Sequence, residues 1–170
     1  VSGMIFMNGT FHGINVNPPA AHAMQVTGNT IGSTSVGGSI WNQEYTNSLW
    51  YSSYVDEGYR YAFTNGIRVY TTPTAGASDI SGNTIAGIKV GNGTNNSGIT
   101  RGIALSLDTL NYSTVNNNTI EGFVLAHPGY ANFRGIEVTA GLVQIGVGGA
   151  NTIGNINNPI ISSGTYNTPN

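Results

Sequence analysis

The sequence predicts an all-β, solenoid-like fold in which short parallel strands stack in register. The first observation is a repeat, because four Gly-Ile pairs are each followed, after a nearly constant interval, by the triplet Asn-Thr-Ile. The interval from glycine to asparagine is 16, 17, 16 and 16 residues, and the pairs are Gly13 with Asn29, Gly66 with Asn83, Gly102 with Asn118 and Gly135 with Asn151. A unit that recurs with a nearly constant internal spacing is typical of a solenoid.

The second observation is the spacing of apolar residues. Within a unit they recur at every second position, as in Ile67 and Val69 or Ile136 and Val138, which is the period of a β-strand. No stretch has the i, i+3, i+4, i+7 pattern for long enough to form a helix, and Gly, Asn, Thr and Ser recur throughout. Helices should therefore be scarce.

Each full unit is expected to contain three short strands. In the second unit they are centred on Ile67–Val69, on Ile80–Ile85 and on Ile88–Val90, and Phe123–Leu125 supplies the third strand of the next unit. The start of the chain, around Met4, is also strand-like. The intervals from an asparagine to the next glycine are 37, 19 and 17 residues, so we expect about four coils with long loops on one side.

Stacked coils place equivalent residues in columns about 4.8 Å apart. Two internal aliphatic columns are expected, formed by Ile14, Ile67, Ile103 and Ile136 and by Ile31, Ile85, Ile120 and Ile153. The repeated asparagines should form a ladder in which each side-chain amide bonds its neighbours in the coils above and below. Its members are Asn29, Asn83, Asn118 and Asn151.

The segments Val26-Thr27-Gly28-Asn29-Thr30-Ile31 and Ile80-Ser81-Gly82-Asn83-Thr84-Ile85 resemble repeats of the pectate-lyase-like superfamily. The resemblance covers roughly Met4 to Asn155, apart from the segment Trp41–Arg60. It implies a right-handed parallel β-helix. That superfamily includes polysaccharide lyases, glycoside hydrolases, phage tailspikes and noncatalytic surface proteins, so the resemblance implies a fold without selecting an activity.

Composition limits the classes of partner. The chain has 170 residues, 7% of them charged, with a formal net charge of −2, and is expected to be a single β-helix segment (1–170) of a longer chain, with 155–170 a loop or tail. Five scattered Lys and Arg residues form no basic patch, so nucleic-acid binding is not expected. No window is apolar enough to insert in a membrane, and the first residues lack the charged start of a signal peptide. Cysteine is absent, and the repeat type favours an extracellular or cell-surface location.

An enzyme of this superfamily needs clustered acids. A glycosidase uses two carboxylates about 5 to 10 Å apart, and a Ca²⁺-dependent lyase uses several beside a basic residue. Two columns are taken as outward, Asn15/Arg68/Ala104/Glu137 and Gly32/Ala86/Glu121/Gly154, and neither gathers two acids. Asp108 and Glu137 are the only candidate catalytic pair, and chance placement of solvated acids is the favoured interpretation.

No cofactor is expected, and metal binding is not expected either. The histidines His12, His22 and His127 lack His or carboxylate partners at ligand spacing.

Arg101 and Arg134 occupy the same position of successive coils, directly before the Gly-Ile pair, where His12 and Asn65 stand in the earlier coils. Two stacked guanidinium groups repel unless an anion lies between them. A carboxylate such as that of Glu137 or Glu121 could serve in the same way. The sequence leaves two interpretations open, a small anionic or sugar-acid site, and stacked, solvated guanidinium planes at a turn.

The insertion at residues 41–61 collects both tryptophans and five of the nine tyrosines. Aromatic rings stack on the apolar faces of sugars, so the insertion is a candidate carbohydrate-binding loop. The candidate rings are Trp41, Tyr45, Trp50, Tyr51, Tyr54 and Tyr59. The alternative is that these rings pack on the flank of the solenoid and cover the loop's own underside.

These observations favour a noncatalytic extracellular β-helix domain of a secreted or surface bacterial protein, adhesin-like or structural, with carbohydrate as a possible ligand class. Its other expected partners are adjoining coils of a longer parent chain or other subunits. A polysaccharide lyase or glycoside hydrolase is the first alternative. Ice binding is the second, since one column of threonines, Thr30, Thr84, Thr119 and Thr152, runs along the strands.

Overall fold

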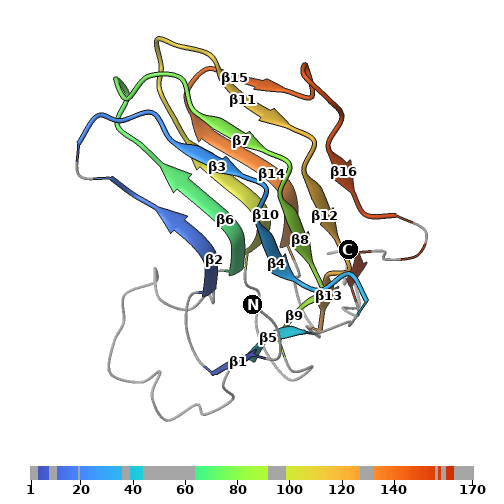
Figure 1. Cartoon of the computed structure of the whole chain (residues 1–170). Coiled ribbons are helices and arrows are strands. Elements are labelled where there is room, and N and C mark those ends of the chain that lie inside the picture. Colours follow the sequence, from blue (N-terminus) through green and yellow to red (C-terminus); the bar gives the residue numbers. More distant parts are fainter. Residues whose placement is uncertain are drawn as a thin grey trace, which may run out of the picture.

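The computed structural model describes residues 4–7, 11–18, 20–35, 39–43, 64–91, 99–126, 132–155, 157 and 160–162. Within these residues the protein is all-β and contains no helix. Its 17 strands form four sheets, in which every neighbouring pair of strands is parallel (Figure 1). The architecture is that of a solenoid-like stack.

The chain visits the four sheets, here named A to D, in a fixed cyclic order. Sheet A contains β1 (Met4–Met7), β5 (Ile40–Gln43), β9 (Ile88–Val90), β13 (Val124–Leu125) and β17 (Ile161–Ser162). Sheet B contains β2 (Phe11–Val16), β6 (Thr64–Tyr70), β10 (Ile99–Ser106) and β14 (Asn132–Ala140). Sheet C contains β3 (Gln25–Thr27), β7 (Asp79–Ser81), β11 (Ser113–Asn116) and β15 (Val143–Ile145). Sheet D contains β4 (Thr30–Gly32), β8 (Thr84–Ala86), β12 (Thr119–Glu121) and β16 (Thr152–Ile153).

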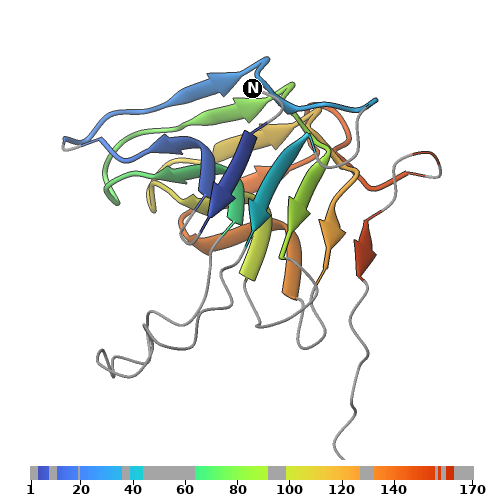
Figure 2. The same cartoon turned by 90° about the horizontal axis from the view of Figure 1, so that it is seen from below.

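One coil is one passage through sheets B, C, D and A. Coil 1 is β2 to β5, coil 2 is β6 to β9, coil 3 is β10 to β13, and coil 4 is β14 to β17; β1 precedes coil 1 at the end of sheet A. Figure 2 shows the five strands of sheet A side by side in chain order, from β1 to β17. The connections from sheet A to sheet B vary most in length and include the longest one, between β5 and β6, whereas those from sheet B to sheet C and from sheet D to sheet A vary less.

The prediction of three strands per coil is wrong, because each coil has four. The expected strand Ile80–Ile85 is two strands, β7 and β8, with Gly82 and Asn83 between them. Gly82 has a φ of 66°, and the equivalent Asn117 of coil 3 has a φ of 55°. Gly and Asn are the residues that adopt this left-handed conformation most readily, and one such residue turns the chain at the corner. Ile80 and Ile85 both face the core although they are five positions apart, so the two-residue period shifts at this corner.

The register of the strands confirms both aliphatic columns. Ile14, Ile67, Ile103 and Ile136 are paired from coil to coil in sheet B, and Ile31, Ile85, Ile120 and Ile153 are paired in sheet D. In coils 2 and 3 these side chains are completely buried, together with Val69, Leu105 and Phe123. The core is therefore a continuous file of aliphatic side chains along the stack.

A contact across the coil explains why Gly-Ile and Asn-Thr-Ile occur together. A Cβ atom added to Gly66 would lie 2.4 Å from Cγ2 of Ile85, which projects from sheet D of the same coil. The same distance is 2.7 Å from Gly13 to Ile31 and 2.6 Å from Gly102 to Ile120. Sheet B therefore needs a residue without a side chain wherever the isoleucine of sheet D reaches across the interior.

The corner asparagines form a ladder with a single direction. The backbone N–H and the Nδ2 group of Asn83 both donate to Oδ1 of Asn118, at 3.0 and 2.9 Å. Asn29 bonds Asn83 in the same way, and Asn118 bonds Asn151. Each Nδ2 from Asn83 onward also donates to a backbone carbonyl of the preceding coil, that of Val26, Ile80 or Val115. The ladder thus satisfies the polar groups of a buried corner.

Two strands lie in segments for which no strand was expected. Trp41, Asn42 and Gln43 of the expected insertion belong to β5, which pairs with both β1 and β9. β17 lies within the expected C-terminal loop or tail and pairs with β13.

Replacing Asn118 with leucine tests the ladder. The change leaves two donors of Asn83 and the carbonyl of Ile80 without partners in a buried corner, and we expect a loss of about 1–3 kcal/mol in the free energy of unfolding. Asn29→Leu is the matched control, because Asn29 is the first asparagine of the ladder and is only half-buried. Urea titration measures both. Equal losses in the two variants would contradict a buried, cooperative ladder.

Replacing Gly66 with alanine tests the contact across the coil. The new methyl group meets Ile85 and the carbonyl oxygen of Gly102, and overpacking of this kind costs about 1–3 kcal/mol. Ile85→Ala, which removes most of the opposing side chain, creates a cavity on its own. The double variant should lose less stability than the two single variants added together, because the deletion relieves part of the clash. Strict additivity would show that the two residues do not oppose each other.

Candidate functional site

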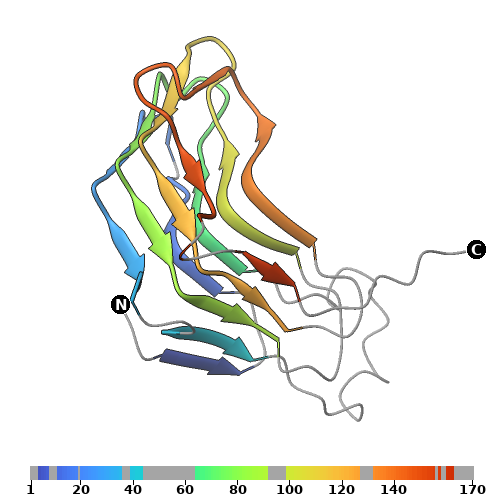
Figure 3. The same cartoon turned by 90° about the vertical axis from the view of Figure 1, so that its right-hand side faces the viewer.

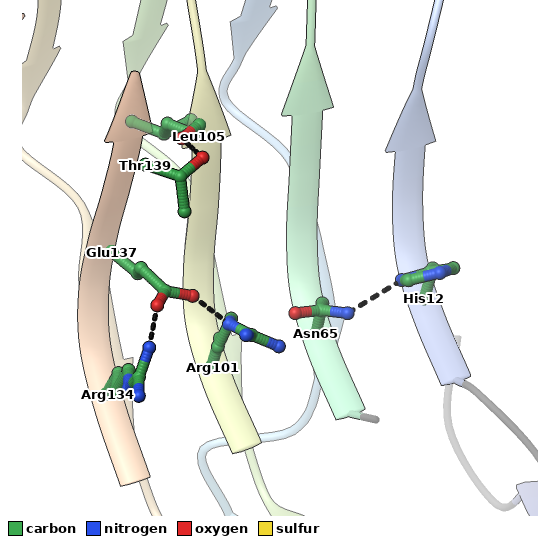
Figure 4. A network of polar contacts seen from close by, with 7 residues as sticks. All are labelled: His12, Asn65, Arg101, Leu105, Arg134, Glu137 and Thr139. Carbon is green, nitrogen blue, oxygen red and sulfur yellow. Dashed lines mark hydrogen bonds and ion pairs between the residues drawn. The ribbon is translucent and has the colours of Figure 1, made fainter. Parts of the chain in front are cut away.

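The candidate site is the outer polar face of sheet B, defined by two positions in each of its strands. The first position, directly before the repeat glycine, holds His12, Asn65, Arg101 and Arg134, and the second, three residues later, holds Asn15, Arg68, Ala104 and Glu137. Strand pairing aligns each set from coil to coil. Figure 4 shows the first set and Glu137 lying across the four strands.

The repeat glycine brings the two positions to one face. Residues three apart in a regular strand point to opposite faces, because side chains alternate. In sheet B the paired residues run up to Arg101 and resume at Ile103, so that Gly102 is skipped, and the same happens at the other three repeat glycines. This step shifts the alternation by one residue. Arg134 and Glu137 of the same strand can consequently bond each other.

Glu137 neutralises both stacked arginines. Its Oε2 accepts a hydrogen bond from Nε of Arg101 in the neighbouring coil, and its Oε1 accepts one from Nη1 of Arg134 (Figure 4). The side chains of Arg101 and Glu137 are largely buried, whereas that of Arg134 is partly exposed. Glu137, which the sequence offered as a carboxylate that two stacked arginines could share, occupies that place, and Arg101 is not a solvated guanidinium. The anion between the arginines is a side chain of the protein itself.

The first two coils are joined on the same face by uncharged partners. Nδ2 of Asn65 lies 3.0 Å from Nδ1 of His12, and Nη1 of Arg68 donates to Oδ1 of Asn15 at 2.9 Å. The Arg68 guanidinium also lies 3.7 Å from the centre of the Tyr70 ring, a cation–π contact. Burial, followed by the charges of Arg68 and Arg101, lowers the pKa of His12, which favours the neutral imidazole that can accept from Asn65. These contacts link one coil to the next.

Asp108 holds a turn and does not face a ligand. It lies between β10 and β11, its side chain is buried, and its oxygens accept backbone N–H bonds from Gly76, Leu110 and Asn111. The bond from Gly76, 2.8 Å long, joins coils 2 and 3. A carboxylate saturated in this way is a structural acceptor with little capacity for proton transfer.

The other described carboxylates are bonded within the chain as well. Asp79 accepts from Thr114 of the next coil and from Ser81, and Glu121 accepts from Asn155. Within the two columns expected to point outward, Glu121, Ala86 and Ala104 are buried, whereas Asn15 is exposed and Arg68 and Glu137 are half-buried. At the spacing of stacked strands, larger neighbours cover small side chains in the same column.

The Trp41 side chain contacts other residues of the protein. It lies in β5, its indole N–H donates to the carbonyl of Gly91 at 2.9 Å, and the ammonium group of Lys89 lies 4.4 Å from its ring centre. One ring face and the polar edge are therefore engaged by the protein. The other candidate rings, Tyr45, Trp50, Tyr51, Tyr54 and Tyr59, lie outside the described residues.

The sequence analysis missed a second, shorter ladder, which is formed by serine side chains. Oγ of Ser78 accepts the backbone N–H of Met24, and Oγ of Ser113 accepts that of Ser78, both at 3.0 Å. Each serine stands five residues before a ladder asparagine, Asn83 or Asn118. That constant offset was the available signal, but the coils at either end have no serine at this position, which obscures it.

The described part of the chain contains no group of three His, Cys, Asp or Glu side chains that could hold a metal ion. His127 lies outside it. Among the same residues, no helix has the length and apolar character required to cross a membrane. Comparisons with protein-family models, with curated proteins and with solved structures found no match to this chain.

The acid dependence of stability tests the role of Asp108. The N–H group of Gly76, followed by those of Asn111 and Leu110, holds the pKa of Asp108 below its usual value. Because the folded pKa is lower than the unfolded one, which lies near 4, the stabilisation is fully present above about pH 4 and is lost as the pH falls through the folded pKa.

Asp108→Asn removes this titration. The free energy of unfolding of the variant should therefore fall less steeply than that of the wild type as the pH is lowered from about 4 to 2. Urea unfolding at a series of pH values measures both slopes, with neutral pH as the reference. Identical acid slopes would show that the carboxylate is not stabilised by these donors.

Proposed function

We propose that this protein is a right-handed parallel β-helix of the pectate-lyase-like kind and serves as a noncatalytic, structural or adhesin-like part of a secreted or cell-surface protein. The cyclic order of the four parallel sheets and the asparagine ladder support the β-helix, and parallel crossovers are right-handed in nearly all proteins. The extracellular location rests on the repeat type and on a surface poor in charge.

One observation supports the noncatalytic role: every described carboxylate accepts hydrogen bonds from other residues of the chain. Asp79, Asp108, Glu121 and Glu137 each accept hydrogen bonds or ion pairs from residues of their own coil or of the adjacent coil. An acid, base or Ca²⁺ ligand needs a carboxylate that faces substrate or metal. These four instead stabilise turns and coil-to-coil contacts.

Carbohydrate contact through the insertion remains a prediction of the sequence. Because Trp41 to Gln43 form part of β5, the loop available for such contact begins after Gln43. A deletion designed to remove the loop while preserving sheet A should keep these three residues.

Incubation with neutral and acidic polysaccharides tests the noncatalytic role. With and without Ca²⁺, we expect no release of reducing ends and no unsaturated products, whereas a polysaccharide lyase run in parallel provides the positive control. Turnover that disappears in Asp108→Ala or Glu137→Ala, with the β-rich circular dichroism spectrum retained, would overturn the proposal in favour of an enzyme.

A further inference from the structure

The aliphatic columns of the core reach the surface at coil 4. Val138, Ile145 and Ile153 are 37%, 50% and 48% exposed, whereas their partners in coil 3, Leu105, Val115 and Ile120, are completely buried. Among the described strands, β14, β15 and β16 are the last of sheets B, C and D, and each has a strand partner on one side only. These three side chains and strand edges define the C-terminal end face, which is turned toward the viewer in Figure 3.

The asparagine ladder also stops at this face with its donors unused. In each earlier coil the backbone N–H and one amide hydrogen of the asparagine bind Oδ1 of the next asparagine. Asn151 accepts from Asn118 and donates to the carbonyl of Val115, but within the described part of the chain no Oδ1 receives its remaining donors. The end face therefore presents two hydrogen-bond donors beside an apolar surface.

The opposite end of the stack differs in burial. Val26 and Ile31, the coil 1 members of the columns that end at Ile145 and Ile153, are buried. Val16, the coil 1 member of the column that ends at Val138, is half-buried. A second copy stacked head to tail would thus meet a surface on which two of the three aliphatic side chains are already covered. Two copies joined through their C-terminal end faces would oppose donor to donor at Asn151. A second copy therefore fits this face poorly.

We propose that the C-terminal end face binds a further β-coil of the same repeat, with aliphatic residues facing Val138, Ile145 and Ile153 and with an asparagine whose Oδ1 accepts from Asn151. The interface would repeat the one between coils 2 and 3, in which the same columns and the same ladder bonds are buried. Open parallel edges, an aliphatic surface and amide donors in one plane match such a coil and no small ligand. This inference rests on the structural role proposed above and names the partner that the role requires.

Appending a coil to the full chain tests the inference. A duplicate of residues 99–125, which carries the sequences of β10 to β13, is fused after Asn170, so that residues 163–170 form a connection of the same length as residues 91–98 between β9 and β10. Hydrogen exchange of the Asn151 backbone amide is the readout. We expect exchange at least tenfold slower than in the original chain, because the copied asparagine supplies the missing acceptor.

Two variant fusions distinguish protection by the ladder bond from nonspecific covering of the end face. Replacing the copy of Asn118 in the appended coil with leucine should abolish the added protection of Asn151, and replacing the copies of Ile103 and Ile120 with lysine should prevent docking. Unchanged exchange in the unmodified fusion, with the original β-rich spectrum retained, would overturn the inference.

Sedimentation of the original chain gives an independent check. We expect the original chain not to dimerise through this face. A dimer formed through it would be lost in Ile145→Lys and kept in Leu110→Lys, the control at an exposed leucine on the β10–β11 connection. Such a dimer would overturn the inference by identifying a second copy as the occupant of the end face. These outcomes are independent of the polysaccharide assay, so failure of the inference and failure of the noncatalytic role can be told apart.

Discussion

The contact between the repeat glycine of sheet B and the isoleucine of sheet D is the constraint on which the rest of the structure depends. It sets how closely two opposite walls of a coil approach, because a side chain such as that of Ile85 occupies the space that any Cβ on Gly66 would need. Every coil repeats this contact, so every coil has the same cross-section. Equal cross-sections allow parallel strands to stay in register and the corner asparagines to meet.

The same glycine shapes the outer surface of sheet B. Because the pairing skips it, residues three apart, such as Arg134 and Glu137, share one face, and a single carboxylate can serve two stacked arginines. Charges on this face therefore become cross-links between coils. Asp108 and Asp79 act in a similar way at the connections, where they receive donors from a neighbouring coil. These charged groups therefore join one coil to the next.

A stack built in this way has a direction. Each ladder asparagine donates toward the next coil and accepts from the previous one, so the two ends of the stack are chemically different. Val26 and Ile31 of coil 1 are likewise buried, whereas Ile145 and Ile153 at the same positions of coil 4 are exposed. This asymmetry favours growth by further coils over association of two identical ends, since only another coil supplies both an aliphatic surface and an amide acceptor.

The sequence by itself determined the parallel stacking, the aliphatic columns and the members of the asparagine ladder, because these follow from local period and from a constant interval. Only the tertiary structure decided the number of sheets, since the corner is turned by a single residue, Gly28, Gly82 or Asn117, in a sequence that contains Gly and Asn throughout. It also decided the roles of the candidate site residues. Glu137 and Asp108 are satisfied by Arg101 and Gly76, each more than 30 residues away in the chain. Such pairings depend on which side chains the coils bring together, and spacing along the sequence does not contain that information.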